Sequence, residues 1–363
     1  MMQDQDNKEN HRGIRLGTIL WIVGVVIVLV AIGLLSIRTT QEDSSEELIP
    51  SPVSNVLNQV EQSAEGAGEG GPSVDSVSLI AFAEQNFDGR DFTVGRVLAE
   101  NDVYTRRYIT YKSGELTISG IMNIPKGSGP FPLLLLNHGH IDTSIYTNGR
   151  GLKREQDYLA RRGYVVIHSD YRGHAESDDD PNTDQRFRLG YAEDVINAIV
   201  AVKKAQLPYV DAERVGMLGH SMGGGVAWRI AVTQPELVDA YVQFAPVSAD
   251  ERDNFEKWTR SRPEVAQRII DQYKNPADNP TFWDNISPIS FFRNIAVPVM
   301  IHHGTTDESV PLAWSERAAK ALQDAQKNVL FHIYPSEPHE FIDAWPTVMQ
   351  RTVSFFDEHV KSK

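Results

Sequence analysis

Residues 219–223 read Gly-His-Ser-Met-Gly, a G-x-S-x-G pattern with Ser221 at its centre. An apolar run at 214–218 precedes it, and residues 224–231 can begin a helix. A serine on such a strand-to-helix turn exposes its hydroxyl for attack on a carbonyl carbon. The N–H of Met222, at the start of the helix, can stabilise an oxyanion. Because so short a pattern also arises in ordinary turns, a catalytic interpretation needs partner residues elsewhere in the chain.

The partners of a nucleophilic serine are a general base and an acid that orients the base. Asp307 follows an apolar run at 297–304, and His339 lies in the loop after a second run at 329–334. The chain order Ser, Asp, His is one that serine hydrolases with a G-x-S-x-G turn use. The sequence therefore predicts that Ser221, His339 and Asp307 act together.

Other residues near this pair could take the same roles. Glu308 is a second candidate for the acid, and Asp307 could simply form a turn after Gly304. His302 and His303 are further candidates for the base. We expect one or both of these histidines to lie in the strand and face the core or a helix.

The second donor to an oxyanion should come from the loop after an early strand. Residues 132–137 form a continuous apolar run, as in a strand covered on both faces, and lead into His138-Gly139-His140-Ile141. The N–H of His140 is the first candidate for this donor, and that of Ile141 is the second.

Two segments contain residues that could bind a metal ion. His138, His140 and Asp142 are spaced as in some metallohydrolases, but Thr143 stands where such sites usually carry a further histidine. Asp178, Asp179 and Asp180 with Asp184 could bind Ca²⁺, although a solvated acidic loop explains them better. We expect no metal and no cofactor.

Several longer motifs resemble the catalytic domain of the prolyl oligopeptidase (S9) family and its dienelactone-hydrolase-like relatives. They lie at 170–177, 210–224, 287–289, 297–304 and 307–311, and at Tyr334-Pro335, His339 and Phe341. The resemblance runs from about Phe92 to the C-terminus. It implies an α/β-hydrolase fold, with Ser221, Asp307 and His339 at the positions of the family's triad.

The chain departs from that family in two respects. The loop at 138–141 has no tyrosine, which many S9 peptidases carry there. The segment before the hydrolase part is also too short for the β-propeller of the oligopeptidases. The resemblance favours a peptidase of short peptides, and these departures keep a carboxylesterase of small esters open.

The elements that would position these residues form an α/β pattern from about Phe92 onward. Strands are expected at 103–111 and 116–124 as a hairpin at one edge, and at 133–137, 164–169, 214–218, 241–246, 297–304 and 329–334. Apolar strands alternating with amphipathic helices predict a mostly parallel, doubly wound sheet. Residues 248–294 are long for a connection and rich in aromatics, so we expect a small helical cap or, alternatively, helices packed on the side of the domain.

The N-terminal part divides into three segments before a hydrolase domain at 79–363. Residues 16–37 are apolar and uncharged and long enough to cross a bilayer, which predicts an uncleaved membrane anchor. A cleaved signal peptide is the alternative, but no clear cleavage site follows these residues. Lys8, Arg12 and Arg15 precede them and Arg38 alone follows closely, which predicts residues 1–15 in the cytoplasm and the hydrolase outside. Residues 38–78, acidic and glycine-rich, are expected to be a flexible linker.

The composition and net charge of the chain exclude several classes of function. The 363 residues carry a net charge of −14, and no basic patch or phosphate-binding loop appears, so nucleic acid is not an expected partner. The absence of cysteine excludes thiol nucleophiles, cysteine-ligated zinc and disulfides. Two rival functions are a hydrolase-fold binding module without turnover and a metal-dependent hydrolase. A serine hydrolase remains the leading prediction.

Overall fold

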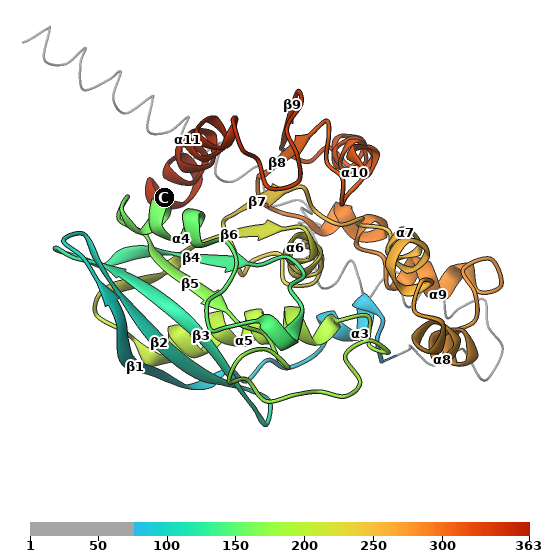
Figure 1. Cartoon of the computed structure of the whole chain (residues 1–363), viewed down its shortest axis with the longest axis horizontal. Helices are drawn as coiled ribbons and strands as arrows, with labels where there is room; N and C mark the ends of the chain where they lie inside the picture. The colour runs from blue at the N-terminus through green and yellow to red at the C-terminus, as the bar shows by residue number, and fades with distance from the viewer. Residues whose placement is uncertain (1–75) are drawn as a thin grey trace, which may run out of the picture. The chain divides into compact units, whose positions relative to one another are not determined.

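The computed structural model describes residues 76–363, and this part contains a nine-stranded sheet (Figure 1). The strand order is β1-β2-β3-β5-β4-β6-β7-β8-β9. The strands β1, β2, β3 and β5 pair antiparallel in succession, and every pair from β5 through β4 to β9 is parallel. Their bounds are β1 Arg90–Glu100, β2 Tyr104–Ser113, β3 Leu116–Pro125, β4 Phe131–Asn137, β5 Val165–Ser169, β6 Val210–His220, β7 Ala240–Phe244, β8 Val299–Gly304 and β9 Val329–Tyr334.

The central strands are apolar throughout because helices cover both faces of the sheet. In β4, Leu133 and Leu135 belong to one buried cluster, and Leu134 and Leu136 belong to another. Successive side chains of a strand point to opposite faces, so a strand buried on both faces needs apolar residues at every position. The continuous leucine run of the sequence therefore follows from this two-sided burial.

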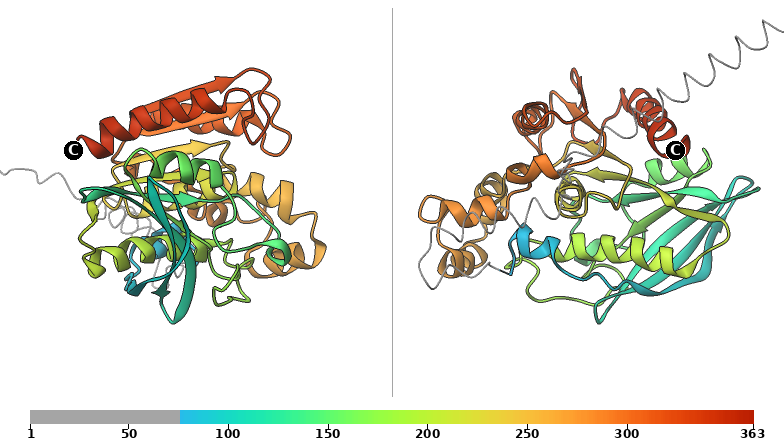
Figure 2. Two further views of the ribbon diagram at one scale, coloured as in Figure 1. Left: turned by 60° about the vertical axis from the view of Figure 1, so that its left-hand side comes forward. Right: turned by 180° about the vertical axis from the view of Figure 1, so that it is seen from behind.

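The helices divide between the two faces, as Figure 2 shows from two further directions. The first cluster includes residues of α3 (Leu79–Ala83), α5 (Leu189–Ala205), α6 (Met222–Thr233) and α10 (Leu312–Asp324). The second includes residues of α4 (Lys153–Ala160), α11 (Trp345–Phe356) and the final turn η4 (Asp357–Lys361). The α/β-hydrolase fold with a mostly parallel sheet agrees with the prediction.

The segment between β7 and β8 is helical and has a small core of its own. It contains α7 (Glu251–Asn254), η2 (Phe255–Thr259), α8 (Pro263–Tyr273), α9 (Pro280–Asn285) and η3 (Pro288–Asn294). A buried cluster joins α8 and α9 through Ala266, Ile269, Phe282 and Trp283. We call residues 248–294 the cap. A further short turn, η1 (Thr143–Ile145), follows β4.

Three features differ from the expectations or lie beyond the described residues. The predicted hairpin at 103–111 and 116–124 is present as β2 and β3, but β1 lies outside it and forms the edge. Val77 and Ser78, which fall within the predicted linker, are buried. The segment predicted to cross a membrane, 16–37, lies outside the described residues, and within residues 76–363 no helix is long and apolar enough to do so.

Candidate active site

Ser221 occupies a strained turn between β6 and α6. Its backbone has φ 55° and ψ −119°, a conformation that L-residues other than glycine rarely adopt. Such strain is kept where the surrounding structure enforces it, and it is concentrated at functional sites. Gly219 permits the turn, because a Cβ atom there would lie 2.4 Å from the carbonyl oxygen of Gly223. The turn carries Ser221 at the carboxyl end of β6 and at the N-terminus of α6.

His339 and Asp307 form a short hydrogen bond at the carboxyl ends of β8 and β9. Asp307 Oδ2 lies 2.7 Å from His339 Nδ1, and Asp307 Oδ1 accepts the N–H groups of Ser309 and Val310 at 2.8 and 2.7 Å. Burial raises the pKa of Asp307, but hydrogen bonds from His303, His339 and the Val310 N–H outweigh it and hold that pKa well below its ordinary value. Asp307 is therefore ionised and can orient the His339 ring through Nδ1–H.

His303, the other candidate for the base in this strand, contacts Asp307. Its Nε2 lies 3.1 Å from Asp307 Oδ2 and 3.0 Å from the carbonyl oxygen of Val310. Both neighbours are acceptors, so Nε2 carries a proton, and Nδ1 can accept the hydroxyl of Ser315 at 2.7 Å. His303 thus helps to fix Asp307 from inside β8, a role that its place in an apolar run did not reveal.

Glu308 and His302, the other candidates for the acid and the base, contact other groups. Glu308 Oε2 accepts the backbone N–H of His339 at 3.3 Å, while the carboxylate that contacts the His339 ring is that of Asp307. His302 is fully buried in β8, with Nδ1 2.7 Å from the hydroxyl of Tyr334. Ser221 and His339 line one pocket, and Asp307 is hydrogen-bonded to His339.

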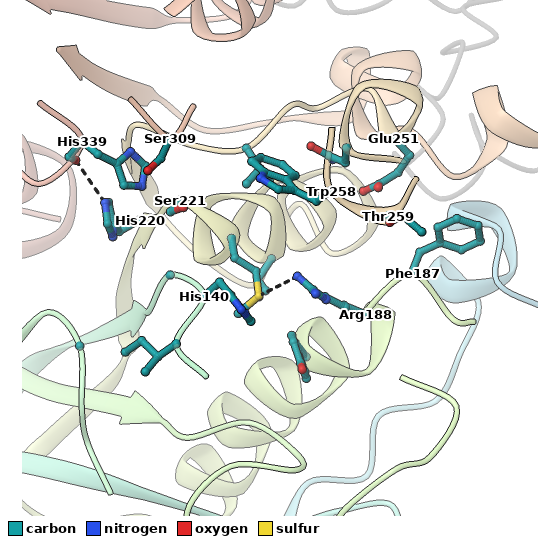
Figure 3. Close-up of a pocket in the computed structure, with 18 of the residues that line it drawn as sticks. His140, Phe187, Arg188, His220, Ser221, Glu251, Trp258, Thr259, Ser309 and His339 are labelled. Carbon is teal, nitrogen blue, oxygen red and sulfur yellow. Dashed lines mark hydrogen bonds between the residues drawn. The ribbon is translucent and has the colours of Figure 1, made fainter. Parts of the chain in front are cut away.

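His220, the variable residue of the G-x-S-x-G pattern, touches the loop that carries His339. The two rings lie 4.6 Å apart between centroids, and His220 Nε2 lies 3.3 Å from the His339 carbonyl oxygen (Figure 3). Burial, together with the neighbouring His339, lowers the pKa of His220 to about 4. His220 is therefore neutral near pH 7 and can donate from Nε2 to that carbonyl. Its place in the motif gave no hint of this contact.

The predicted oxyanion donors lie around Ser221. Met222 is the first residue of α6, where backbone N–H groups have no acceptor within the helix. His140 and Ile141 follow β4 and line the same pocket as Ser221. Gly139 lets this loop pass close to Ser221, because a Cβ atom there would lie 3.1 Å from the Cβ of Ser221.

A buried carboxylate holds the loop after β4 in place. Asp170 Oδ1 accepts the Tyr146 hydroxyl at 2.8 Å and the Gly149 N–H at 2.7 Å. Asp170 Oδ2 accepts Asn148 Nδ2 at 2.7 Å and the hydroxyl of Ser119 in β3 at 2.6 Å. These bonds connect the loop that carries His140 to the sheet.

A pocket of about 610 Å³ opens at Ser221. Its walls come from the loop after β4, the start of α5, the turn at Ser221, the loops of Asp307 and His339, and the cap. The cap contributes Glu251, Asn254, Trp258, Thr259, Ser261 and Arg262. This volume lies in the range of small-molecule sites, about 300–1,000 Å³. The cap residues thus border the space in which a substrate of Ser221 would lie.

The residues weighed as metal ligands have other contacts. His138 is fully buried, its Nδ1 lies 2.7 Å from the Gly139 carbonyl oxygen, and burial lowers its pKa to about 3. Asp142 Oδ1 accepts the N–H of Ser144 at 2.9 Å. Between residues 76 and 363, no group of three or more histidine, aspartate or glutamate side chains is arranged to hold a metal ion.

The acidic loop at 178–184 is bound to arginines and to the backbone. Asp180 Oδ2 pairs with Arg172 at 3.1 Å, and Asp178 Oδ2 accepts the N–H of Thr117 at 2.7 Å. Asp184 Oδ2 pairs with Arg262 of the cap at 2.8 Å. These carboxylates thus stabilise the loop and its contact with the cap.

Comparison with known proteins identifies the family. The model of the prolyl oligopeptidase family matches residues 151–363, more than half of the chain. The chain belongs to the prolyl oligopeptidase family. It is a serine hydrolase with the α/β-hydrolase fold, as its sequence motifs predict.

Relatives include both peptidases and esterases. The uncharacterised peptidase YuxL of Bacillus subtilis is 27% identical over 59% of this chain and 32% of YuxL. Esterase EstD of Thermotoga maritima is 25% identical over 64% of this chain and 61% of EstD. The acylaminoacyl peptidase of Pyrococcus horikoshii has the same fold, with a TM-score of 0.58 and 23% identity over 72% of this chain and 42% of that protein. The chain spans about a third of the length of several curated relatives, YuxL among them.

Proposed function

We propose that Ser221, His339 and Asp307 form a catalytic triad that cleaves peptide, amide or ester bonds through an acyl-enzyme. The observation that carries the proposal is the 2.7 Å contact of Asp307 with His339 Nδ1 beside a serine in a strained turn. In this arrangement His339 Nε2 takes the proton of the Ser221 hydroxyl as the oxygen attacks the carbonyl carbon. Asp307 keeps the required tautomer of His339 and stabilises the imidazolium that forms.

The remaining steps use the same groups. The N–H groups of Met222 and of His140, or Ile141 as second candidate, hold the negative oxygen of the tetrahedral intermediate. His339 then gives its proton to the leaving group, which departs with the electrons of the broken bond. Water, deprotonated by His339, then attacks the acyl carbon. The bond to Ser221 Oγ breaks, His339 returns the proton to that oxygen, and the acid is released. In each half of the reaction, His339 accepts a proton from the attacking oxygen and donates it to the atom that departs.

The first candidate substrate is a short peptide or aminoacyl amide, because the family and YuxL point to peptide bonds. A carboxylesterase is the second candidate, and the similarity to EstD favours it. The pocket of about 610 Å³ under the cap suits either a short peptide or a small ester.

We also propose that residues 16–37 anchor the chain in a membrane, with the hydrolase domain on the extracytoplasmic side. The support is the uncharged apolar stretch and the basic residues before it. A protease added to intact cells should remove the hydrolase domain. Protection of the domain in intact cells, with cleavage only after lysis, would contradict this orientation.

The test of the chemistry compares substrates on the full chain. Hydrolysis is measured for wild type, for Ser221→Ala and for Ser362→Ala, a matched control that replaces an exposed serine. The substrates are short and long p-nitrophenyl esters and aminoacyl and prolyl p-nitroanilides. Anilide cleavage that depends on Ser221 would support the peptidase, and ester cleavage with inert anilides would support the carboxylesterase. Turnover that survives Ser221→Ala and stops with a chelator would overturn the triad.

A further inference from the structure

Arg188 lies in the pocket at the start of α5, and the function proposed for the triad leaves it without a role. Its Nη1 lies 3.3 Å from the thioether sulfur of Met222, which is a weak acceptor. Its Nε lies 3.8 Å from Asp184 Oδ1, beyond hydrogen-bonding distance. Figure 3 shows Arg188 among the side chains that surround the pocket.

The other charged side chains of the pocket have closer partners or lie elsewhere. Asp184 pairs with Arg262 at 2.8 Å, and Arg229 pairs with Glu251. Glu308 and Glu340 belong to the loops of Asp307 and His339. Among the described pocket residues, Arg188 is therefore the cation without a carboxylate closer than 3.8 Å.

A strained backbone conformation holds Arg188 in this position. Phe187 and Arg188 have φ values of 50° and 57°, two consecutive non-glycine residues in the left-handed region. The ring of Phe187 packs against Tyr273, Phe282 and Trp283 of the cap, with centroids 5.5, 5.9 and 5.5 Å away. Because the cap core fixes Phe187, the next residue is directed to the pocket. Strain kept by its surroundings is typical of ligand-binding positions.

The position of Arg188 relative to Ser221 and His339 determines which part of a substrate it can contact. The leaving group must stay near His339, because that residue gives it a proton. In Figure 3, His339 and Arg188 lie on opposite sides of Ser221. The acyl part of a substrate bound to Ser221 therefore extends toward Arg188, along walls that include Tyr191, Val226 and Trp258.

We propose that Arg188 binds an anionic group on the acyl part of the substrate, so that the enzyme prefers acyl groups that carry a carboxylate. Such substrates are esters or amides of dicarboxylic acids, including peptides with an acidic side chain before the cleaved bond. A guanidinium suits a carboxylate because its N–H groups can form two parallel hydrogen bonds. This inference rests on the proposed acyl transfer at Ser221.

The test compares matched pairs of esters with one leaving group. The full chain hydrolyses mono-p-nitrophenyl adipate, which is anionic, and p-nitrophenyl hexanoate, its neutral equivalent of equal chain length, together with shorter and longer pairs. The measured quantity is the ratio of kcat/KM for the anionic ester to that for the neutral ester. The variants are Arg188→Gln, Arg188→Lys and the control Arg268→Gln, which removes an exposed cap charge outside the pocket.

We expect wild type and Arg268→Gln to prefer the anionic ester. Arg188→Gln should lower the ratio about tenfold to a hundredfold, as for loss of a hydrogen-bonded charge partner, and Arg188→Lys should retain part of it. Higher ionic strength should lower the wild-type ratio, which gives a test that needs no variant. Hydrolysis that depends on Ser221 with no anionic preference, or with a ratio unchanged in Arg188→Gln, would overturn this inference alone. Absence of any hydrolysis that depends on Ser221 would overturn the proposed function as well.

Discussion

Replacement of Glu337 by glutamine should destabilise the loop that carries His339. The Glu337 carboxylate is buried and accepts two backbone N–H groups, that of Ile342 at 2.6 Å and that of Ala344 at 2.8 Å. Ala344 is the residue before α11, so the negative charge also lies at a helix N-terminus, where it is favoured. The Glu337 carbonyl oxygen accepts the N–H of Thr306, next to Asp307.

The size of the effect follows from the two donors. Both are backbone N–H groups that cannot rotate, and glutamine offers one oxygen and one NH₂ group. One N–H must therefore face another donor, and the remaining bond loses its charge. Leaving a buried donor unpaired costs about 1–3 kcal/mol, and hydrogen bonds to a charged group contribute about 1.5–3 kcal/mol against about 1 kcal/mol for neutral ones. We expect Glu337→Gln to lower the free energy of unfolding by about 2–4 kcal/mol.

Urea unfolding of the full chain measures this loss as a shift of the midpoint at unchanged slope. The matched control is Glu340→Gln, the same change in the same loop on a side chain that is 69% exposed. A surface change of this kind should stay within about 0.5 kcal/mol. A loss for Glu337→Gln no larger than that of Glu340→Gln would refute the argument that these two bonds fix the loop.

The other predictions concern Asp307 and the buried histidines. Asp307→Asn should lower kcat by about 10⁴-fold, because an amide does not fix the His339 tautomer that the reaction needs, whereas Glu308→Gln should lower it far less. Steady-state kinetics with the large loss in Glu308→Gln and a small one in Asp307→Asn would contradict this assignment. The pKa of Asp307 in the folded protein is below its unfolded value of 3.8, so the contribution of Asp307 to stability should be complete above about pH 4 and shrink as the pH falls further. This contribution is measured as the difference in unfolding free energy between wild type and Asp307→Asn. His138 and His220 have pKa values of about 3 and about 4 against 6.5 unfolded, so the unfolded state binds more protons between these values. Stability should therefore fall as the pH is lowered from 6.5 toward 4, by up to about 1.4 kcal/mol per pH unit for each histidine, and a flat profile in urea unfolding would contradict their neutral burial.

The parts of the fold predicted from the sequence are those in which burial constrains every residue. The run at 133–137 had to be apolar because both faces of β4 are covered. The edge strand β1 was not predicted, because it is partly exposed and its register with β2 shifts at several points, which breaks the alternation of apolar and polar residues. The helical cap was predicted from its length and aromatics, whereas its helices and their packing were not.

The candidate site likewise contains residues that the sequence predicts and residues that it does not. Ser221, Asp307 and His339 each follow a strand in the required chain order. The structure places Ser221 and His339 at one pocket, with Asp307 hydrogen-bonded to His339. The roles of His303 and Glu337 depend on contacts between neighbouring loops that no spacing in the sequence reveals. Arg188 points into the pocket because of two left-handed residues and the cap core around Phe187, so its position depends on tertiary packing.

Covalent labelling of Ser221 tests the central claim most directly. The full chain is incubated with a fluorophosphonate, and peptide mapping by mass spectrometry locates the adduct. We predict one adduct on Ser221, its absence in Ser221→Ala, and much slower formation in His339→Ala, because the hydroxyl then lacks its base. A chain that hydrolyses its substrate without labelling at Ser221, or that labels equally fast in His339→Ala, would contradict the account.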